Sequence, residues 1–155
     1  MNENDPNHWK KTGCFMLKFF REGDFQFIIV DDWIPMNGEV PAFTRGGDDG
    51  LEMWPTILEK AYAKLYGSYD NIEAGKVHLA LADLVENGFP EQLALKSYAA
   101  SVSIFASILR KLDRNRALMG AGSPEHEDGD RAVNEEGIVQ GHAYAILDVD
   151  DYQGT

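Results

Sequence analysis

His142 is the residue of this sequence best suited to proton transfer. It stands in the run GHAYAI at 141–146. The ordinary pKa of an imidazole lies nearest neutrality, so histidine serves as general acid or base more readily than any other side chain. Gly141 and Ala143 leave the ring uncrowded, and the alternation that follows predicts a strand. The residues alone allow two interpretations, a catalytic base or a core histidine bonded to a backbone carbonyl.

Cys14 is the one cysteine in the chain. A lone cysteine with a distant histidine is an arrangement found in thiol proteases, which makes Cys14 a candidate nucleophile. A reactive thiolate is usually stabilised by a helix N-terminus or by nearby positive charge, whereas Cys14 lies in TGCFMLKFF, which is typical of a strand. We therefore predict that Cys14 is a small buried apolar residue. One cysteine forms no intramolecular disulfide, which fits a reducing compartment.

Three local clusters of acidic residues offer oxygen ligands of the kind that calcium prefers. The clusters are Asp48–Asp49–Glu52, Glu125–Glu127–Asp128–Asp130 and Asp148–Asp150–Asp151. None has the spacing of an EF-hand, so a solvated charged surface is the favoured interpretation of each. The other histidines, His8, His78 and His126, have no Cys or His neighbours at the spacing of a zinc site. The sequence contains neither a phosphate-binding loop nor the nucleophile elbow of serine hydrolases.

The net charge of the chain is strongly negative. Its 155 residues include 14 Lys and Arg against 26 Asp and Glu, a formal net charge of −12. This charge repels nucleic acid and anionic lipid and favours cations and basic protein segments as partners. No apolar stretch approaches the length of a membrane span, and residues 1–11 lack the apolar core of a signal peptide. We expect a cytoplasmic protein without nucleic acid partners or membrane insertion, and association with the cytoskeleton stays open.

Periodicity and turn signals predict the elements that position these residues. We predict a flexible lead-in at 1–12, a β-hairpin at 14–35, helices at 51–69, 76–88 and 97–118, an acidic loop at 120–137 and a strand at 137–149. Pro55 suits the first turn of the first helix, and Gly67 and Gly88 suit helix ends. Strands first, helices in the middle and strands last are typical of the α+β class.

Three stretches of the sequence resemble the protease core of calpains, which are papain-related cysteine peptidases. VDDWIP at 30–35 resembles a strand of that family and the proline after it, and LEMWPTILEKAYAKLYGSYDNI at 51–72 is similar to the helix that comes next. GIVQGHAYAI at 137–146 resembles the strand that carries the family's catalytic histidine. The order and approximate spacing of the stretches agree with the family, and the resemblance covers most of residues 15–150.

The resemblance implies an incomplete papain-like core of the α+β class, with an N-terminal β-hairpin, central helices and C-terminal β-strands. Residues 13–72 would be the C-terminal part of the first subdomain, 75–155 the N-terminal part of the second, and 73–76 the hinge. His142 would be the general base of an intracellular cysteine endopeptidase. The family's catalytic cysteine would lie before residue 1 and its asparagine after Thr155, so we expect this chain alone to be inactive.

The resemblance also implies regulation by calcium, because calpain cores bind calcium in each half. Glu52 stands at the position of a glutamate that contributes to the first of these sites, and the other ligands would lie outside this chain. Protein substrates or protein partners are expected. A non-catalytic calpain-like binding module and a soluble α+β domain with a structural histidine stay open as alternatives. Half of a cleft leaves apolar surface uncovered, so we expect self-association of the isolated chain.

Overall fold

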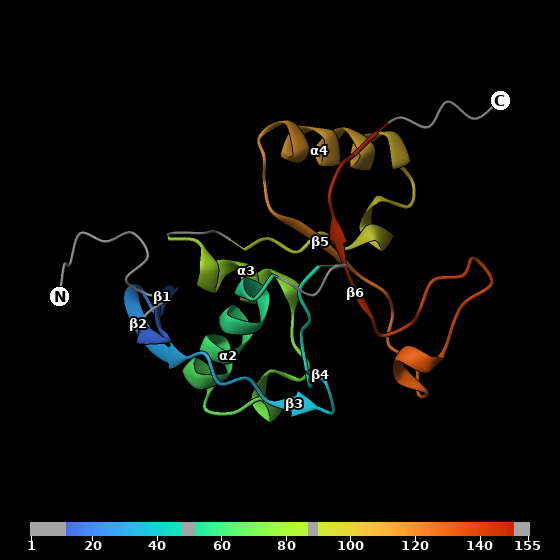
Figure 1. The fold of residues 1–155 in the computed structure, drawn as a ribbon. Coiled ribbons are helices and arrows are strands. Elements are labelled where there is room, and N and C mark those ends of the chain that lie inside the picture. The colour runs from blue at the N-terminus through green and yellow to red at the C-terminus, as the bar shows by residue number, and fades with distance from the viewer. Residues whose placement is uncertain (1–11, 48–51, 87–89, 151–155) are drawn as a thin grey trace. The chain divides into compact units, whose positions relative to one another are not determined.

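The chain divides into two units, each of which is described by itself. The computed structural model describes residues 12–47, 52–86 and 90–150. The first unit consists of Met1–Gly75 and Asp83–Asn87, and the second of Lys76–Ala82 and Gly88–Thr155. The described residues form three α-helices and three two-stranded antiparallel sheets, which confirms the predicted mixture of helices and strands (Figure 1). The predicted subdomain bounds stay a prediction, and all but one residue of the predicted lead-in lies outside the described residues.

A β-hairpin opens the described part of the first unit, as predicted. Its strands, β1 (Cys14–Arg21) and β2 (Asp24–Asp31), pair antiparallel over their whole length. Glu22 and Gly23 link them with φ angles of 56° and 82°. Two linking residues of positive φ are typical of the hairpin turn whose twist matches that of the flanking strands.

Short elements complete the first unit around its main helix. A second hairpin of two-residue strands, β3 (Met36–Asn37) and β4 (Val40–Pro41), follows the first. The main helix is α2 (Trp54–Tyr66), and the 3-10 helix η1 (Asp70–Ile72) comes after it. Proline in the first turn of α2 and a helix end at Gly67, where φ is 98°, are confirmed.

The core of the first unit lies between the hairpin and α2 (Figure 1). Phe19 and Val30 from the hairpin meet Ile57 and Ala61 from the helix, and all four side chains are buried. Strand alternation supplies the first pair, and the four-residue helical step supplies the second. Among the described residues, every fully buried apolar side chain belongs to this unit.

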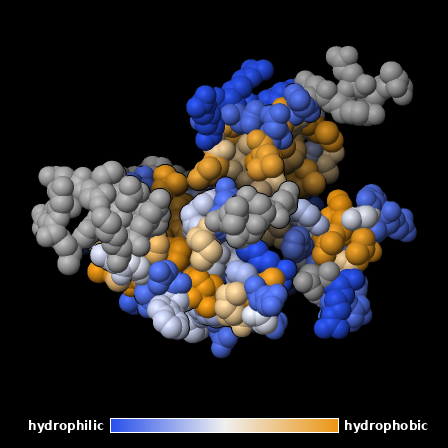
Figure 2. All heavy atoms as spheres, viewed as in Figure 1, coloured by the Kyte–Doolittle hydropathy of each residue, from blue (hydrophilic) through white to orange (hydrophobic). Residues whose placement is uncertain are grey.

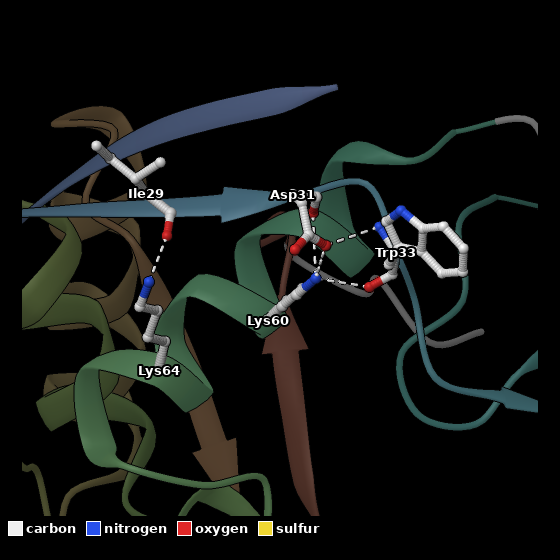
Figure 3. Close-up of polar contacts among 5 residues, drawn as sticks. All are labelled: Ile29, Asp31, Trp33, Lys60 and Lys64. Carbon is white, nitrogen blue, oxygen red and sulfur yellow. Dashed lines mark hydrogen bonds and ion pairs between the residues drawn. The ribbon is translucent and has the colours of Figure 1, made fainter. Parts of the chain in front are cut away.

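Two lysines of α2 bind the open edge of β2 (Figure 3). The Lys60 ammonium donates to the backbone carbonyls of Asp31 and Trp33, at 3.3 and 2.6 Å, and to the Asp31 carboxylate. The Lys64 ammonium donates to the carbonyl of Ile29 at 2.7 Å. β2 pairs only with β1 in its sheet, so its other edge carries unpaired backbone groups. The lysines satisfy carbonyls of that edge and hinder its pairing with a further strand.

Replacing Lys60 by methionine is expected to make the melting temperature less sensitive to acid. The hydrogen bond from Lys60, followed by that from the Trp33 N–H, lowers the pKa of the Asp31 carboxyl below its ordinary 3.8. When the pKa is lower in the folded state, the stabilisation is complete above the unfolded pKa and is lost as pH falls through the folded pKa. Below about pH 4.5 the wild-type Tm should therefore fall more steeply than that of Lys60→Met.

Lys64→Met is the matched control for this experiment, because it removes a lysine from the same helix and leaves the Lys60–Asp31 pair in place. Thermal unfolding followed by circular dichroism at a series of pH values gives the slope of Tm against pH for each protein. Lys64→Met should keep most of the wild-type slope, because the charge of Lys64 makes the smallest of the contributions that lower the pKa of Asp31. Equal slopes for wild type and Lys60→Met would contradict the role given to Lys60.

Two tyrosines of α2 hold Asp83, near the end of α3 (Val77–Leu84). The Tyr62 and Tyr66 hydroxyls donate to the same oxygen of the buried Asp83 carboxylate, at 2.8 and 2.6 Å. Burial, then hydrogen bonding with Tyr66 and with Asp83, raises the pKa of the Tyr62 phenol. α3 ends before the predicted stop at Gly88, which itself lies outside the described residues.

The largest helix described in the second unit is α4 (Val102–Arg114). The single helix predicted at 97–118 is wrong at both ends. The 3-10 helix η2 (Leu95–Tyr98) precedes α4, and Ser101, with φ at −150°, separates the two. At the other end, α4 stops at Arg114. Figure 2 shows hydrophilic residues over the upper side of α4 and apolar residues beneath it. No residue of α4 is fully buried, and self-association of the chain stays a prediction. None of the described helices is long and apolar enough to cross a membrane.

Candidate active site

A small sheet in the second unit positions His142. Its strands, β5 (Met119–Gly122) and β6 (Ala143–Ile146), pair antiparallel with Gly122 opposite Ala143. His142 directly precedes β6, so the pairing of β6 with β5 sets the direction of the backbone at His142. The predicted strand is thus confirmed around the histidine, although it is shorter than the predicted range of 137–149.

β5 was not predicted, and it contradicts the start of the acidic loop expected at 120–137. The sequence of β5 is MGAG, which lacks the β-branched and aromatic residues that mark a strand. At Gly120 a side chain has no room, because a Cβ atom there would lie 2.5 Å from Val77 Cγ1. Later in the predicted loop, η3 (Gly129–Arg131) forms a further 3-10 turn.

The side chain of His142 is exposed. Its ring meets that of Tyr144 edge to face, with centroids 5.1 Å apart and an interplanar angle of 77°. Residues two apart on a strand share a face, which brings these two rings together. The alternative of a buried core histidine is therefore wrong. An exposed imidazole is open to a group that gives up or takes a proton.

Hydrogen bonds order the loop that leads into His142. The N–H of Val139 donates to the Tyr144 hydroxyl oxygen at 3.0 Å, and the N–H of Gly141 donates to the Pro124 carbonyl at 2.7 Å. Gly141 has a φ of 60°, in the left-handed region that favours glycine. The glycine of GHAYAI therefore has a structural role beside its small size.

Cys14 begins β1, as predicted, but its side chain is exposed, and the prediction that it is buried is wrong. Alternation explains the difference, because the odd-numbered residues Phe15, Leu17 and Phe19 of β1 pack in the core. Cys14 shares the opposite face with Met16, which is 66% exposed. A thiol in a strand lacks the helix N-terminus that commonly activates a catalytic cysteine.

Glu52 lies two residues before the start of α2 at Trp54, and its side chain is exposed. The chain passes close to it, since a Cβ atom at Gly46 would lie 1.9 Å from the Glu52 carbonyl oxygen. A Cβ atom at Gly47 would lie 3.5 Å from Oε2 of the Glu52 carboxylate. The approach at Gly46 leaves no room for a side chain, whereas the distance at Gly47 is an ordinary van der Waals contact.

Glu59 of α2 binds Thr44, just before the segment that contains Gly46 and Gly47. The N–H and the hydroxyl of Thr44 donate to the two oxygens of the Glu59 carboxylate, at 3.0 and 2.6 Å. The Thr56 hydroxyl in turn donates to the Thr44 carbonyl at 3.2 Å. These bonds hold the chain beside α2 just before it reaches Gly46 and Glu52.

The described residues near Glu52 do not form a calcium site by themselves. Calcium takes six to eight oxygen ligands, and Glu52 offers one carboxylate. Within 12–47, 52–86 and 90–150, no group of three or more His, Cys, Asp or Glu side chains is placed to hold a metal ion. Asp48 and Asp49 lie outside the described residues, so their share in a site stays a prediction.

In the described part of the chain, neither His78 nor His126 belongs to a group of three or more side chains that could hold a metal ion. His126 Nδ1 accepts a hydrogen bond of 3.2 Å from the N–H of Asp128, within its own loop. His78 lies on α3, and His8 falls outside the described residues.

Asp148 and Asp150 of the last acidic cluster line a polar hollow of about 340 Å³ in the second unit. Arg110, Asp113, Arg114 and Val149 complete its lining. The carboxylates therefore lie among guanidinium groups. This mixed lining fits the predicted solvated charged surface better than a cation site.

The sequence comparisons decide the family. The profile described as calpain family cysteine protease matches residues 1–155. The chain belongs to the calpain family of cysteine proteases. The predicted resemblance is confirmed, and the mixed helix-and-strand structure is consistent with a partial calpain protease core.

Relatives of this calpain-family chain include long plant proteins. Calpain-type cysteine protease DEK1 of Zea mays is 40% identical over 151 residues, which are 94% of this chain and 7% of that protein. Calpain-type cysteine protease ADL1 of Oryza sativa subsp. japonica is 38% identical over 151 residues, with the same two coverages. Calpain-A of Drosophila melanogaster is 33% identical over 139 residues, 89% of this chain and 16% of that protein. The chain thus spans about 7% of the length of its plant relatives.

Proposed function

We propose that this chain forms part of the core of a calpain-type endopeptidase that hydrolyses peptide bonds of intracellular proteins, with His142 as the general base. The observation that carries the proposal is the exposed imidazole of GHAYAI at the entry to β6, in a chain of the calpain family. In this role the imidazole takes the proton of a cysteine thiol and pairs with the resulting thiolate. It then returns the proton to the leaving amine.

The nucleophile in this proposal is not Cys14. It is the one cysteine of the chain and it begins a strand, whereas the catalytic cysteine of the family opens a helix. A base without a nucleophile forms no acyl-enzyme. The 155-residue chain is therefore proposed to be inactive by itself, and catalysis is assigned to the full-length protein in the cytoplasm.

Hydrolysis of an unfolded protein substrate tests this function. The full-length protein should cleave it, and the cleavage should stop after treatment with a thiol-directed epoxide that alkylates one cysteine other than Cys14. The isolated chain should show neither cleavage nor stoichiometric labelling. A full-length protein that is folded, resists the epoxide and cleaves nothing would overturn the peptidase assignment.

The strong negative charge favours a second candidate, a calpain-like module that binds basic protein segments without cutting them. A net charge of −12 increases the rate of encounter with positively charged partners. Partner binding that needs no calcium and survives His142→Ala, without any peptidase activity, would support this candidate. Cleavage of the bound partner would exclude it.

We also propose that calcium stabilises the full-length protein, with Glu52 supplying one carboxylate ligand. Glu52→Gln keeps the size of the side chain and removes its charge. Because calcium affinity depends on ligand charge, the calcium concentration for half-maximal stabilisation should rise by about tenfold or more. A calcium titration of the thermal unfolding temperature measures this change without reference to activity.

Glu39→Gln is the control for the calcium titration, because it makes the same change at an exposed glutamate of the first unit. It should leave the midpoint unchanged. Coincident titrations of wild type and Glu52→Gln would remove Glu52 from the proposed site.

A further inference from the structure

Ser123 holds the backbone of His142 on both sides. It follows β5 directly and stands opposite His142, one step beyond the pair of Gly122 and Ala143. The Ser123 N–H donates to the His142 carbonyl at 2.9 Å, as a further backbone bond of the ladder. The return bond is unusual because the His142 N–H donates to the Ser123 hydroxyl, at 2.9 Å, in place of a backbone carbonyl.

The same hydroxyl also reaches the other peptide group of His142. Its oxygen lies 3.1 Å from the His142 carbonyl, to which it donates. A serine hydroxyl has one hydrogen and two lone pairs, so it can accept from the N–H and donate to the carbonyl at once. Three hydrogen bonds from one residue thus fix the two peptide groups that flank the Cα atom of His142.

This arrangement sets the direction of the imidazole without touching it. With both peptide groups held, the Cα–Cβ bond of His142 has one direction, and the ring then rests against Tyr144. The N–H of the preceding Gly141 bonds to Pro124, the neighbour of Ser123, so the two chains stay joined beyond the end of the sheet. The ring itself remains exposed and able to exchange protons.

We propose that Ser123 is a positioning residue for His142, a role that rests on the proposed function of His142 as the base. Misplacing a catalytic group by about 1 Å can cost about a hundredfold in rate. A residue that fixes the backbone of the base should therefore affect turnover more than substrate binding. Ser123 does not contact the reacting atoms in this proposal.

Ser123→Ala in the full-length protein tests the inference. It removes the hydroxyl and keeps the backbone N–H, so kcat should fall by about ten- to a hundredfold with KM nearly unchanged. Ser123→Thr retains a hydroxyl and should restore most of kcat. Ser103→Ala, on the exposed side of α4, is the matched control and should match wild type. Thermal unfolding of each variant shows that it is folded.

The outcomes separate this inference from the proposed function. If His142→Ala is inactive while Ser123→Ala retains the wild-type kcat, Ser123 has no positioning role. If Ser123→Ala does not fold, a Ser123→Thr variant that folds but has lost turnover would overturn the inference equally. If His142→Ala retains full activity, the proposed function fails first, whatever the Ser123 variants do.

Discussion

Replacing His142 by alanine is expected to lower the kcat/KM of the full-length protein by about four orders of magnitude or more. Without the imidazole, no group at this position takes the proton from the attacking thiol or stabilises the thiolate. The leaving amine also loses its proton donor. Initial rates on a fluorogenic peptide, with active protein measured before each assay, give the ratio.

His126→Ala is the control for this experiment. It removes an exposed histidine from the same unit, one whose ring contacts only Asp128, in its own loop, among the described contacts. It should leave kcat/KM within about twofold of wild type, as for surface substitutions away from special features. Loss of activity in His126→Ala comparable to that in His142→Ala would contradict the role given to His142.

Replacing Phe19 by alanine is expected to lower the free energy of unfolding of the first unit by about 3–5 kcal/mol. Phe19 is 1% exposed and packs between the hairpin and α2 against Val30, Ile57 and Ala61. Its ring also contacts that of Tyr62, with centroids 5.7 Å apart. Removing it leaves a cavity that the rigid hairpin and helix fill only in part. Urea unfolding of the chain followed by circular dichroism measures the loss.

Phe27→Ala is the matched control, because it makes the same change in the same hairpin. Phe27 is 59% exposed, so its removal takes away little buried contact. The expected loss is below about 1 kcal/mol. If the two variants unfold at the same urea concentration, the core is not where the structure places it.

The elements with a strong repeating pattern could be predicted from the sequence. The sequence of the hairpin has two apolar runs around a turn that accepts positive φ, and the observed strands and turn agree with that pattern. α2 has apolar residues at three- and four-residue steps, proline in its first turn and Gly67 at its end. In each case the local preference and the tertiary packing favour the same structure.

The surroundings of His142 could be predicted only in part. The strand after the histidine follows from alternation, but β5 exists because MGAG lies close enough to pair with it. One methionine and three small residues carry no periodic signal. Ser123 therefore fell within a predicted loop. One signal for this pairing is present in the sequence. The predicted strand after His142 has no predicted partner, and a run of small residues that ends in Ser123 is available to pair with it.

The face to which a strand residue points depends on tertiary contacts as well as alternation. The pattern of β1 places Cys14 and Phe15 on opposite sides, but it does not say which side packs against α2. The structure places Phe15 against the core and leaves Cys14 exposed. The fit of Phe19 between Ile57 and Ala61 decides the matter, and that fit involves residues about forty positions apart.

The measurement that tests the central claim most directly is the pH dependence of cysteine alkylation in the full-length protein, with and without His142. An ordinary thiol ionises with a pKa of about 8.5, and pairing with an imidazolium lowers this pKa. The account predicts that a thiol-directed epoxide labels the wild-type catalytic cysteine rapidly at pH 6, whereas His142→Ala is labelled only as pH approaches about 8.5. The same pH profile in both proteins would contradict the assignment of His142 as the base.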